Sequence, residues 1–213
     1  MAKIKAIVFD YDGVIVDSFP IVHTIYHRIC AQFGKHCPLD FQDFKKVYGV
    51  SSQKFLTESG FTDEEKNQAN LLFKKLILEH TPPFFPDIAE VIEVLAKTHT
   101  LFVVTANHME EVVAKMNALG VVHCFKEIIG SQLAGPMKKV DPLKALLQNY
   151  HYASEEVVMI GDRDPDYIHA KEAGFLHVIL VDYGWGYSKD KYPQKIPIKK
   201  PKDIVKAIAA LER

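Results

Sequence analysis

The chain has 213 residues, of which 48% are hydrophobic and 25% are charged, and its formal net charge is -1. This length predicts one large domain, or a core domain with a modest insertion, and the composition supports an apolar core without disulfides or structural metals. The near-zero net charge gives no long-range attraction for nucleic acid, and the spacing of the three cysteines indicates neither a disulfide framework nor a zinc site.

The beginning of the chain does not have the pattern of a targeting signal. Its first apolar run, from Ala6 to Phe9, stops at Asp10, which is too early for a signal peptide or a membrane span. We therefore expect a cytoplasmic protein with no membrane partner. Lysines between prolines near the end of the chain indicate an exposed connection and not a nucleic-acid-binding arm. These are Lys191, Lys195, Lys199, Lys200 and Lys202.

Short apolar runs bounded by turn residues recur along the chain and are typical of buried parallel strands. They span residues 4–9, 101–105, 127–130, 157–160 and 178–181. Helical periodicity lies between most of them, and a last helix follows the final run. The predicted helices span residues 87–97, 109–119, 142–150, 165–173 and 203–211. Strands that alternate with helices predict an α/β fold with a doubly wound parallel sheet.

The segment between the first two predicted strands breaks this alternation. Residues 19–83 carry helical periodicity and no strand pattern, and Pro82, Pro83 and Pro86 end the block. We therefore expect an all-helical insertion at 19–83, hinged at both ends, and a catalytic core made of 1–18 and 84–213.

Two carboxylates follow the first predicted strand, in Asp10-Tyr11-Asp12-Gly13. Open α/β sheets bind their ligands at the carboxyl ends of strands, so this position predicts a site. One carboxylate there is suited to attack a substrate and the other to transfer protons, and both can help to hold a cation. The competing interpretation is that the two acids merely end a strand and cap a turn.

A second acidic loop follows the predicted strand at 157–160. Asp164 before Pro165 has an ordinary role as the cap and first turn of the next helix, whereas Asp162 and Asp166 need another explanation. Carboxylates gathered from both loops repel one another unless a cation compensates their charge. An oxygen-rich cluster of this kind suits Mg²⁺.

The other strand ends supply groups that suit a phosphate. Thr105, Ala106 and Asn107 follow the second predicted strand, where the Thr105 hydroxyl and backbone amides at a helix N-terminus can bind phosphoryl oxygens. Lys138 and Lys139 precede a later helix, and one of them can neutralise the charge of a phosphoryl group. Taken singly, each of these features is more typical of an ordinary role: a threonine that ends a strand, or a surface lysine pair.

Taken in order, the four motifs resemble those of the haloacid dehalogenase superfamily, in its capped phosphatase branch, over essentially the whole chain. The likeness implies a Rossmann-like fold with a helical cap, and Mg²⁺-dependent hydrolysis through an aspartyl phosphate. It implies that Asp10 is the nucleophile and Asp12 the general acid and base, and that Thr105 and Lys139 bind the phosphoryl group. Spacing to Pro142 favours Lys139 over Lys138.

The same resemblance implies a metal site made of Asp10, the backbone carbonyl of Asp12, and Asp162, with Asp166 orienting Lys139 or the metal shell. Arg163 departs from the pattern, because the family usually has a small polar residue there. Its expected role is to help neutralise the site, to bind substrate or to point to solvent. The general likeness is to phosphoglycolate phosphatases, so we expect a small phosphorylated metabolite as substrate and a monomer or weak homodimer.

Three other functions remain to be weighed. The first is a dehalogenase, which needs neither a second aspartate in the first motif nor Mg²⁺, so the presence of Asp12 argues against it. A β-phosphoglucomutase-like phosphotransferase shares Gly49-Val50-Ser51, but Ser52 stands where that group typically has Arg, which favours hydrolysis. A non-catalytic binding protein is disfavoured because no motif residue is missing. Five residues are open between lining the substrate pocket and ordinary surface or capping roles: Ser18, His23, Ser52, Gln53 and Lys54. Residues 183–186, after the last predicted strand, are open between a flexible rim loop and simple packing.

Overall fold

The computed structural model describes residues 3–37, 40–48, 52–131, 138–186, 189–194 and 196–212. The chain divides into two compact units, which we describe separately. The helical unit is Asp17–Pro83, and the sheet unit comprises Met1–Val16 and Phe84–Arg213. Two features considered above, Gly49-Val50-Ser51 and Lys195, lie outside the described residues. The other four lysines of the late run are exposed, as predicted.

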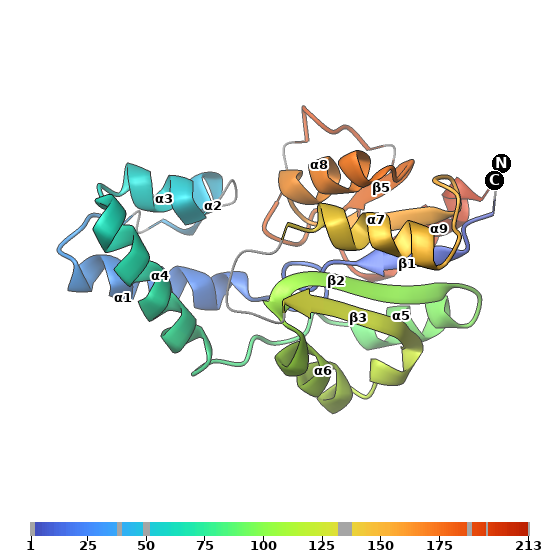
Figure 1. The fold of residues 1–213 in the computed structure, drawn as a ribbon, viewed down its shortest axis with the longest axis horizontal. Helices are drawn as coiled ribbons and strands as arrows, with labels where there is room; N and C mark the ends of the chain where they lie inside the picture. Colours follow the sequence, from blue (N-terminus) through green and yellow to red (C-terminus); the bar gives the residue numbers. More distant parts are fainter. Residues whose placement is uncertain are drawn as a thin grey trace. The chain divides into compact units, whose positions relative to one another are not determined.

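The sheet unit contains a parallel sheet of five strands in the order β3-β2-β1-β4-β5 (Figure 1). The strands are β1 (Ala6–Phe9), β2 (Thr100–His108), β3 (Phe125–Ser131), β4 (Val157–Gly161) and β5 (His177–Leu180). The first strand is central, with Phe9 opposite Val103 of β2 on one side and Ile160 of β4 on the other. This order confirms the predicted α/β class.

Helices cover both faces of the sheet. One face packs against α5 (Ile88–Ala96), α6 (Met109–Ala118) and α9 (Lys202–Leu211), and the other against α7 (Val140–Asn149) and α8 (Asp164–Ala173). A short 3₁₀ helix, η1 (Val122–Cys124), leads into β3. Figure 1 shows α5 and α6 on the side of the sheet opposite α7 and α8. The sheet is therefore doubly wound, as predicted.

Because helices cover both faces of the sheet, the strands consist of continuous apolar runs. In β1, Ala6 and Val8 face the α7 and α8 layer, whereas Ile7 and Phe9 face the opposite layer, and all four side chains are fully buried. Parallel strands covered on both faces need apolar residues at every position. The centre of the sheet is therefore fully buried between the two helix layers.

The helical unit contains α1 (Phe19–Gln32), α2 (Phe41–Tyr48), α3 (Ser52–Glu58) and α4 (Asp63–Ile77), and its described residues contain no strand. Its core is aromatic: the ring of Tyr26 stacks on Phe73 at a centroid distance of 5.0 Å and meets Phe55 edge-on at 5.0 Å. A capping box formed by Thr62 and Glu65 begins α4.

In the described parts of both units, every helix is too short or too polar to cross a membrane.

Candidate functional site

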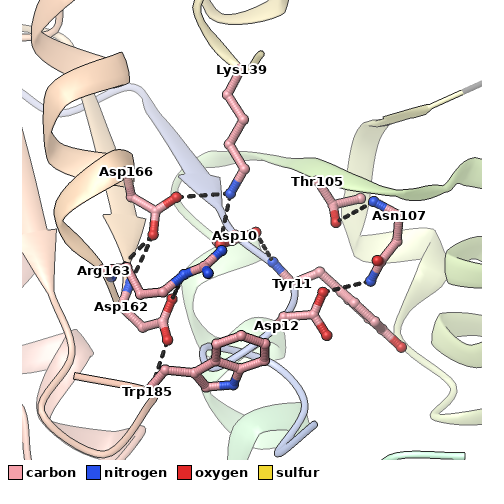
Figure 2. Close-up of polar contacts among 10 residues, drawn as sticks. All are labelled: Asp10, Tyr11, Asp12, Thr105, Asn107, Lys139, Asp162, Arg163, Asp166 and Trp185. Carbon is pink, nitrogen blue, oxygen red and sulfur yellow. Dashed lines mark hydrogen bonds and ion pairs between the residues drawn. The ribbon is translucent and has the colours of Figure 1, made fainter. Parts of the chain in front are cut away.

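The carboxyl ends of three neighbouring strands carry the acidic and hydroxyl groups of the site. Asp10 follows β1, Thr105 lies near the end of β2, and Asp162 follows β4. The backbone N–H of Asp10 donates to the carbonyl of Ile160 at 2.8 Å, which continues the pairing of β1 with β4 one residue beyond the strand. The register of the sheet thus brings the first and second acidic loops side by side (Figure 2).

Three buried carboxylates meet there. Asp10, Asp162 and Asp166 each offer an oxygen within 4.8 Å of the other two, and their exposed fractions are 2%, 0% and 2%. The Asp12 carboxylate is not among the three. Its Oδ2 accepts a hydrogen bond from Asn107 Nδ2 at 2.6 Å, toward the end of β2 (Figure 2). The two acids of the first loop therefore have different surroundings, as two different chemical roles require.

Lys139 supplies the buried positive charge of the cluster. Its Nζ lies 2.7 Å from Asp10 Oδ2 and 2.8 Å from Asp166 Oδ1, and only 6% of the residue is exposed. Lys138, one residue earlier, is exposed. Of this adjacent pair, Lys139 is thus the lysine that contacts the carboxylates, and helix α7 begins directly after it.

The second acidic loop has a local structure slightly different from the one predicted. The Asp164–Pro165 pair lies inside the first turn of α8, and Arg163 is the residue that precedes the helix. The carboxylate of Asp166 accepts the backbone N–H groups of Asp162 at 3.2 Å and Arg163 at 3.1 Å. Asp166 therefore satisfies the amides at the start of α8 with one oxygen and holds Lys139 with the other.

Burial and charge shift the pKa values of these acids in opposite directions. Burial raises the pKa of Asp10 to about 7, although the neighbouring Lys139 partly opposes this shift. Burial also raises the pKa of Asp162 well above its ordinary value. For Asp166, burial is outweighed by Lys139 and Arg163, which lower its pKa to about 2. One lysine thus compensates Asp166 but leaves Asp10 and Asp162 short of positive charge.

This donor set fits a divalent cation. Asp162 Oδ1 is buried and has no hydrogen-bond partner among the described residues. Carboxylate oxygens are the ligands that Mg²⁺ prefers, and a cation would supply the charge that Asp10 and Asp162 lack. Both oxygens of Asp166 already accept hydrogen bonds, from Lys139 and from the two backbone amides. The low pKa of Asp166 shows that these contacts and Arg163 compensate its charge without a cation, whereas Asp10 and Asp162 lack such compensation. The cluster therefore fits Asp10 and Asp162 as ligands and Asp166 as the support of Lys139.

The candidate phosphate-binding segment differs in shape from the prediction. Residues 105–107 belong to β2, which continues to His108 with an irregular register, and α6 begins only at Met109. The backbone amides at this point are therefore not those of a helix N-terminus. The Thr105 side chain is 1% exposed, and its Oγ1 accepts the N–H of Asn107 at 3.1 Å. Ala106 is exposed.

Two further residues contact the Asp162 side chain: Trp185, whose contact was not predicted, and Arg163. The backbone N–H of Trp185 donates to Asp162 Oδ2 at 2.7 Å. The guanidinium of Arg163 lies over the Trp185 ring at 4.7 Å, and its Nε is 3.9 Å from Asp162 Oδ1. Arg163 therefore adds positive charge beside the cluster, one of the three roles that the sequence left open.

Comparison with known proteins identifies the family. A family model described as haloacid dehalogenase-like hydrolase matches residues 7–181. The chain belongs to this family. A phosphoglycolate phosphatase of Synechococcus elongatus is 23% identical over 98% of this chain and 99% of its own length. A phosphorylated carbohydrates phosphatase of Thermotoga maritima is 21% identical over 96% of this chain and 98% of its own length.

Solved structures share the fold of the whole chain. The haloacid dehalogenase-like hydrolase SP0104 from Streptococcus pneumoniae has a TM-score of 0.82 and 24% identity, over 97% of this chain and 99% of its own. A predicted phosphoglycolate phosphatase from Haemophilus somnus has a TM-score of 0.77 and 24% identity, over the same shares. These structures confirm the predicted fold class, and the family model confirms the family predicted from the motifs.

Proposed function

We propose that this hydrolase removes the phosphoryl group of a small phosphate monoester, with Asp10 as the nucleophile. The observation that carries the proposal is the buried cluster of Asp10, Lys139, Asp162 and Asp166 at the carboxyl ends of β1 and β4, with Asp12 on the same loop as Asp10. Relatives that span the whole chain are named as phosphatases of phosphoglycolate and of phosphorylated carbohydrates, which supports this substrate class.

The surroundings of Asp10 suit a nucleophile. Its Oδ1 accepts the backbone N–H of Tyr11 at 2.6 Å, and its Oδ2 faces Lys139. These contacts fix the carboxylate so that little reorganisation is needed before attack. A Mg²⁺ ion held by Asp10 and Asp162, with the carbonyl of Asp12, would supply the positive charge that screens the nucleophile from an anionic phosphate.

The first half of the reaction transfers the phosphoryl group to the protein. An Asp10 oxygen forms a bond to phosphorus while the bond from phosphorus to the ester oxygen breaks, and Asp12 gives its proton to the leaving oxygen. The amide of Asn107, 2.6 Å from Asp12 Oδ2, holds that carboxyl group in place. Lys139 and the Thr105 hydroxyl stabilise the phosphoryl oxygens.

The second half regenerates the enzyme. Asp12, now ionised, takes a proton from a water molecule that attacks phosphorus, the bond from phosphorus to Asp10 breaks, and inorganic phosphate leaves. Asp12 is again protonated and Asp10 again a free carboxylate. Asp166 takes no part in bond making in this scheme: it accepts a hydrogen bond from Lys139 and two from backbone amides, and it positions Lys139.

A substrate screen tests the proposal. The purified protein is assayed for release of inorganic phosphate from a broad panel of phosphorylated metabolites with Mg²⁺ present, and Asp10→Asn is the control. We expect several small monoesters, with phosphoglycolate and sugar phosphates among the first candidates, to be hydrolysed. The Asn variant should lose at least about a thousandfold in turnover, because an amide is a poor nucleophile and a weaker ligand. Near-normal turnover by that variant would contradict the mechanism.

A further inference from the structure

The segment that follows β5, residues 183–186, lies directly against the acidic cluster. The Trp185 backbone N–H donates to Asp162 Oδ2, as Figure 2 shows, and the Tyr183 hydroxyl donates to the carbonyl of Val14 at 3.0 Å. The segment is thereby tied to the loop after β1 and to the loop after β4. Together these loops carry both of the proposed carboxylate ligands.

Two glycines permit this close approach. A Cβ atom at Gly184 would lie 2.3 Å from the carbonyl oxygen of Gly13 and 2.6 Å from the Cβ of Asp162. A Cβ atom at Gly13, which has a φ of +74°, would lie 2.0 Å from Asp162 Oδ2. Atoms do not pack this closely, so any side chain at either position would push the three backbone segments apart.

The hydrogen bond from the Trp185 N–H makes the two carboxylate oxygens of Asp162 unequal. Oδ2 is occupied by the Trp185 N–H at 2.7 Å, whereas Oδ1 is buried without a hydrogen-bond partner in the described part of the chain, and its nearest cation, Arg163 Nε, is 3.9 Å away. A carboxylate that is fully buried with one oxygen left open is costly unless a further group binds it. An anchored oxygen beside an open one is the usual arrangement of a metal-binding carboxylate and its supporting hydrogen bond.

We propose that residues 183–186 form a positioning element for the metal site, in which the Trp185 amide holds Asp162 so that Oδ1 faces the cation. This inference rests on the proposed function and adds a role for a segment that sequence reasoning left open between a rim loop and packing. The indole ring itself has a different task. It is 5% exposed and lies under the Arg163 guanidinium, which keeps the segment in place.

Three variants separate the backbone amide from the side chain. Trp185→Pro removes the N–H, and Gly184→Ala forces the segment away from Gly13 and Asp162. Trp185→Phe is the matched control, because it keeps both the N–H and an aromatic face for Arg163. Calorimetric titration with Mg²⁺ alone gives the dissociation constant of each. We expect the first two to bind Mg²⁺ at least about tenfold more weakly than wild type and the Phe variant to stay within about threefold.

A measurement on the unaltered chain covers the case in which a variant fails to fold. The sequence contains one tryptophan, so labelling with ¹⁵N-tryptophan gives a single backbone amide signal, that of Trp185. A hydrogen bond to a metal-binding carboxylate should make this signal shift on addition of Mg²⁺, with the same midpoint as the calorimetric titration. Asp162→Asn should abolish the shift.

The outcomes distinguish this inference from the proposed function. The inference is overturned if wild type binds Mg²⁺ but the Trp185 signal does not move, or if folded Trp185→Pro and Gly184→Ala bind Mg²⁺ as wild type does. It is also overturned if Trp185→Phe loses as much affinity as Trp185→Pro. Each of these results leaves the proposed hydrolysis intact. A wild-type protein that binds no Mg²⁺ would instead overturn the metal-dependent function and the inference together.

Discussion

At the scale of single residues, the two adjacent lysines have contrasting surroundings. Lys139 is buried between Asp10 and Asp166, and those two carboxylates raise its pKa in spite of the burial. Lys138 is exposed. A lysine that remains charged in a buried acidic cluster is suited to neutralise a phosphoryl group, whereas an exposed one is surrounded by water that screens its charge.

This contrast predicts that Lys139→Gln and Lys138→Gln behave differently. Loss of the Lys139 charge should lower kcat/KM by at least about a hundredfold, since a positioned charge at the transferring group contributes several kcal/mol. Lys138→Gln, the adjacent control, should stay within about threefold of wild type. Steady-state kinetics on the best substrate from the screen make the comparison. An equal loss in both variants, or a larger loss at Lys138, would contradict the assignment of Lys139.

The positions of the acids could be predicted because each follows an apolar strand of a parallel sheet, and the strand order then brings those strand ends together. The contact of Trp185 with Asp162 could not be predicted, because it is made by a backbone amide, which every residue except proline has, and because the two residues are separated by 23 positions. The position of the Arg163 guanidinium over the Trp185 ring is likewise a tertiary contact. The positions of site residues were thus predictable from sequence where side-chain chemistry and strand ends coincided, whereas contacts made by the backbone were not.

At the scale of elements, α4 has the clearest local signal for its start. The Thr62 side chain accepts the N–H of Glu65, and the Glu65 carboxylate accepts the N–H of Thr62 at 2.8 Å. We predict that Thr62→Ala lowers the free energy of unfolding by about 1 kcal/mol, or about 2–4 °C in Tm, because one amide at the start of the helix loses its acceptor.

Thermal unfolding followed by circular dichroism measures this effect, and Thr62→Ser is the control because its hydroxyl can make the same hydrogen bond. The Ser variant should melt close to wild type. The capping interpretation of Thr62 would be wrong if the Ala variant were as stable as wild type, or if the Ser variant lost as much stability as the Ala variant.

The predicted boundaries of strands and helices agree with the structure in the part of the sheet that is covered on both faces, and agree less well near the site. The predicted strand at 101–105 continues to His108, because β2 pairs with β3 again at His108 after an irregular register over residues 105–107. Gly130 lies beside this continuation, and a Cβ atom there would be 2.8 Å from the carbonyl oxygen of Asn107. Such a backbone contact is tertiary, so propensity and periodicity over residues 105–107 did not indicate it.

At the scale of the whole molecule, the proposed metal site predicts that activity depends on added metal. We predict that excess chelator abolishes turnover, that Mg²⁺ restores it, and that Ca²⁺ does not, because the larger and looser Ca²⁺ shell disturbs in-line attack. Phosphate release after dialysis against chelator, followed by readdition of each ion, tests this prediction. Full activity in excess chelator, or equal restoration by Ca²⁺, would contradict it.

The helical unit leads to a prediction about substrate size. We propose that Asp17–Pro83 acts as a cap over the site, so the enzyme should prefer small soluble monoesters to phosphopeptides and oligonucleotides. Closure of a cap lets contacts remote from phosphorus stabilise the transition state, and a polymer leaves no room for closure. The measurement is kcat/KM for a panel of all three classes. A phosphopeptide that outranks every metabolite would show that the helical unit does not act as a lid.

The fold and family of the molecule were predictable because strands, helices and motifs occur in one consistent order along the chain. The identity of the substrate was not, because residues such as His23 and Gln53 belong to the helical unit, where each also has an ordinary surface or packing role. Substrate choice depends on which of these side chains reach the ligand. That is a property of tertiary arrangement and not of local pattern.

The central claim is that Asp10 becomes phosphorylated, and rapid acid quenching tests it most directly. The enzyme is mixed with its best substrate and Mg²⁺, quenched in acid during turnover, digested and analysed by peptide mass spectrometry, with Asp10→Asn in parallel. The mechanism predicts one added phosphoryl group on the peptide that contains Asp10 in wild type, and none in the variant. A phosphoryl group on another residue, or the same modified peptide from Asp10→Asn, would contradict it.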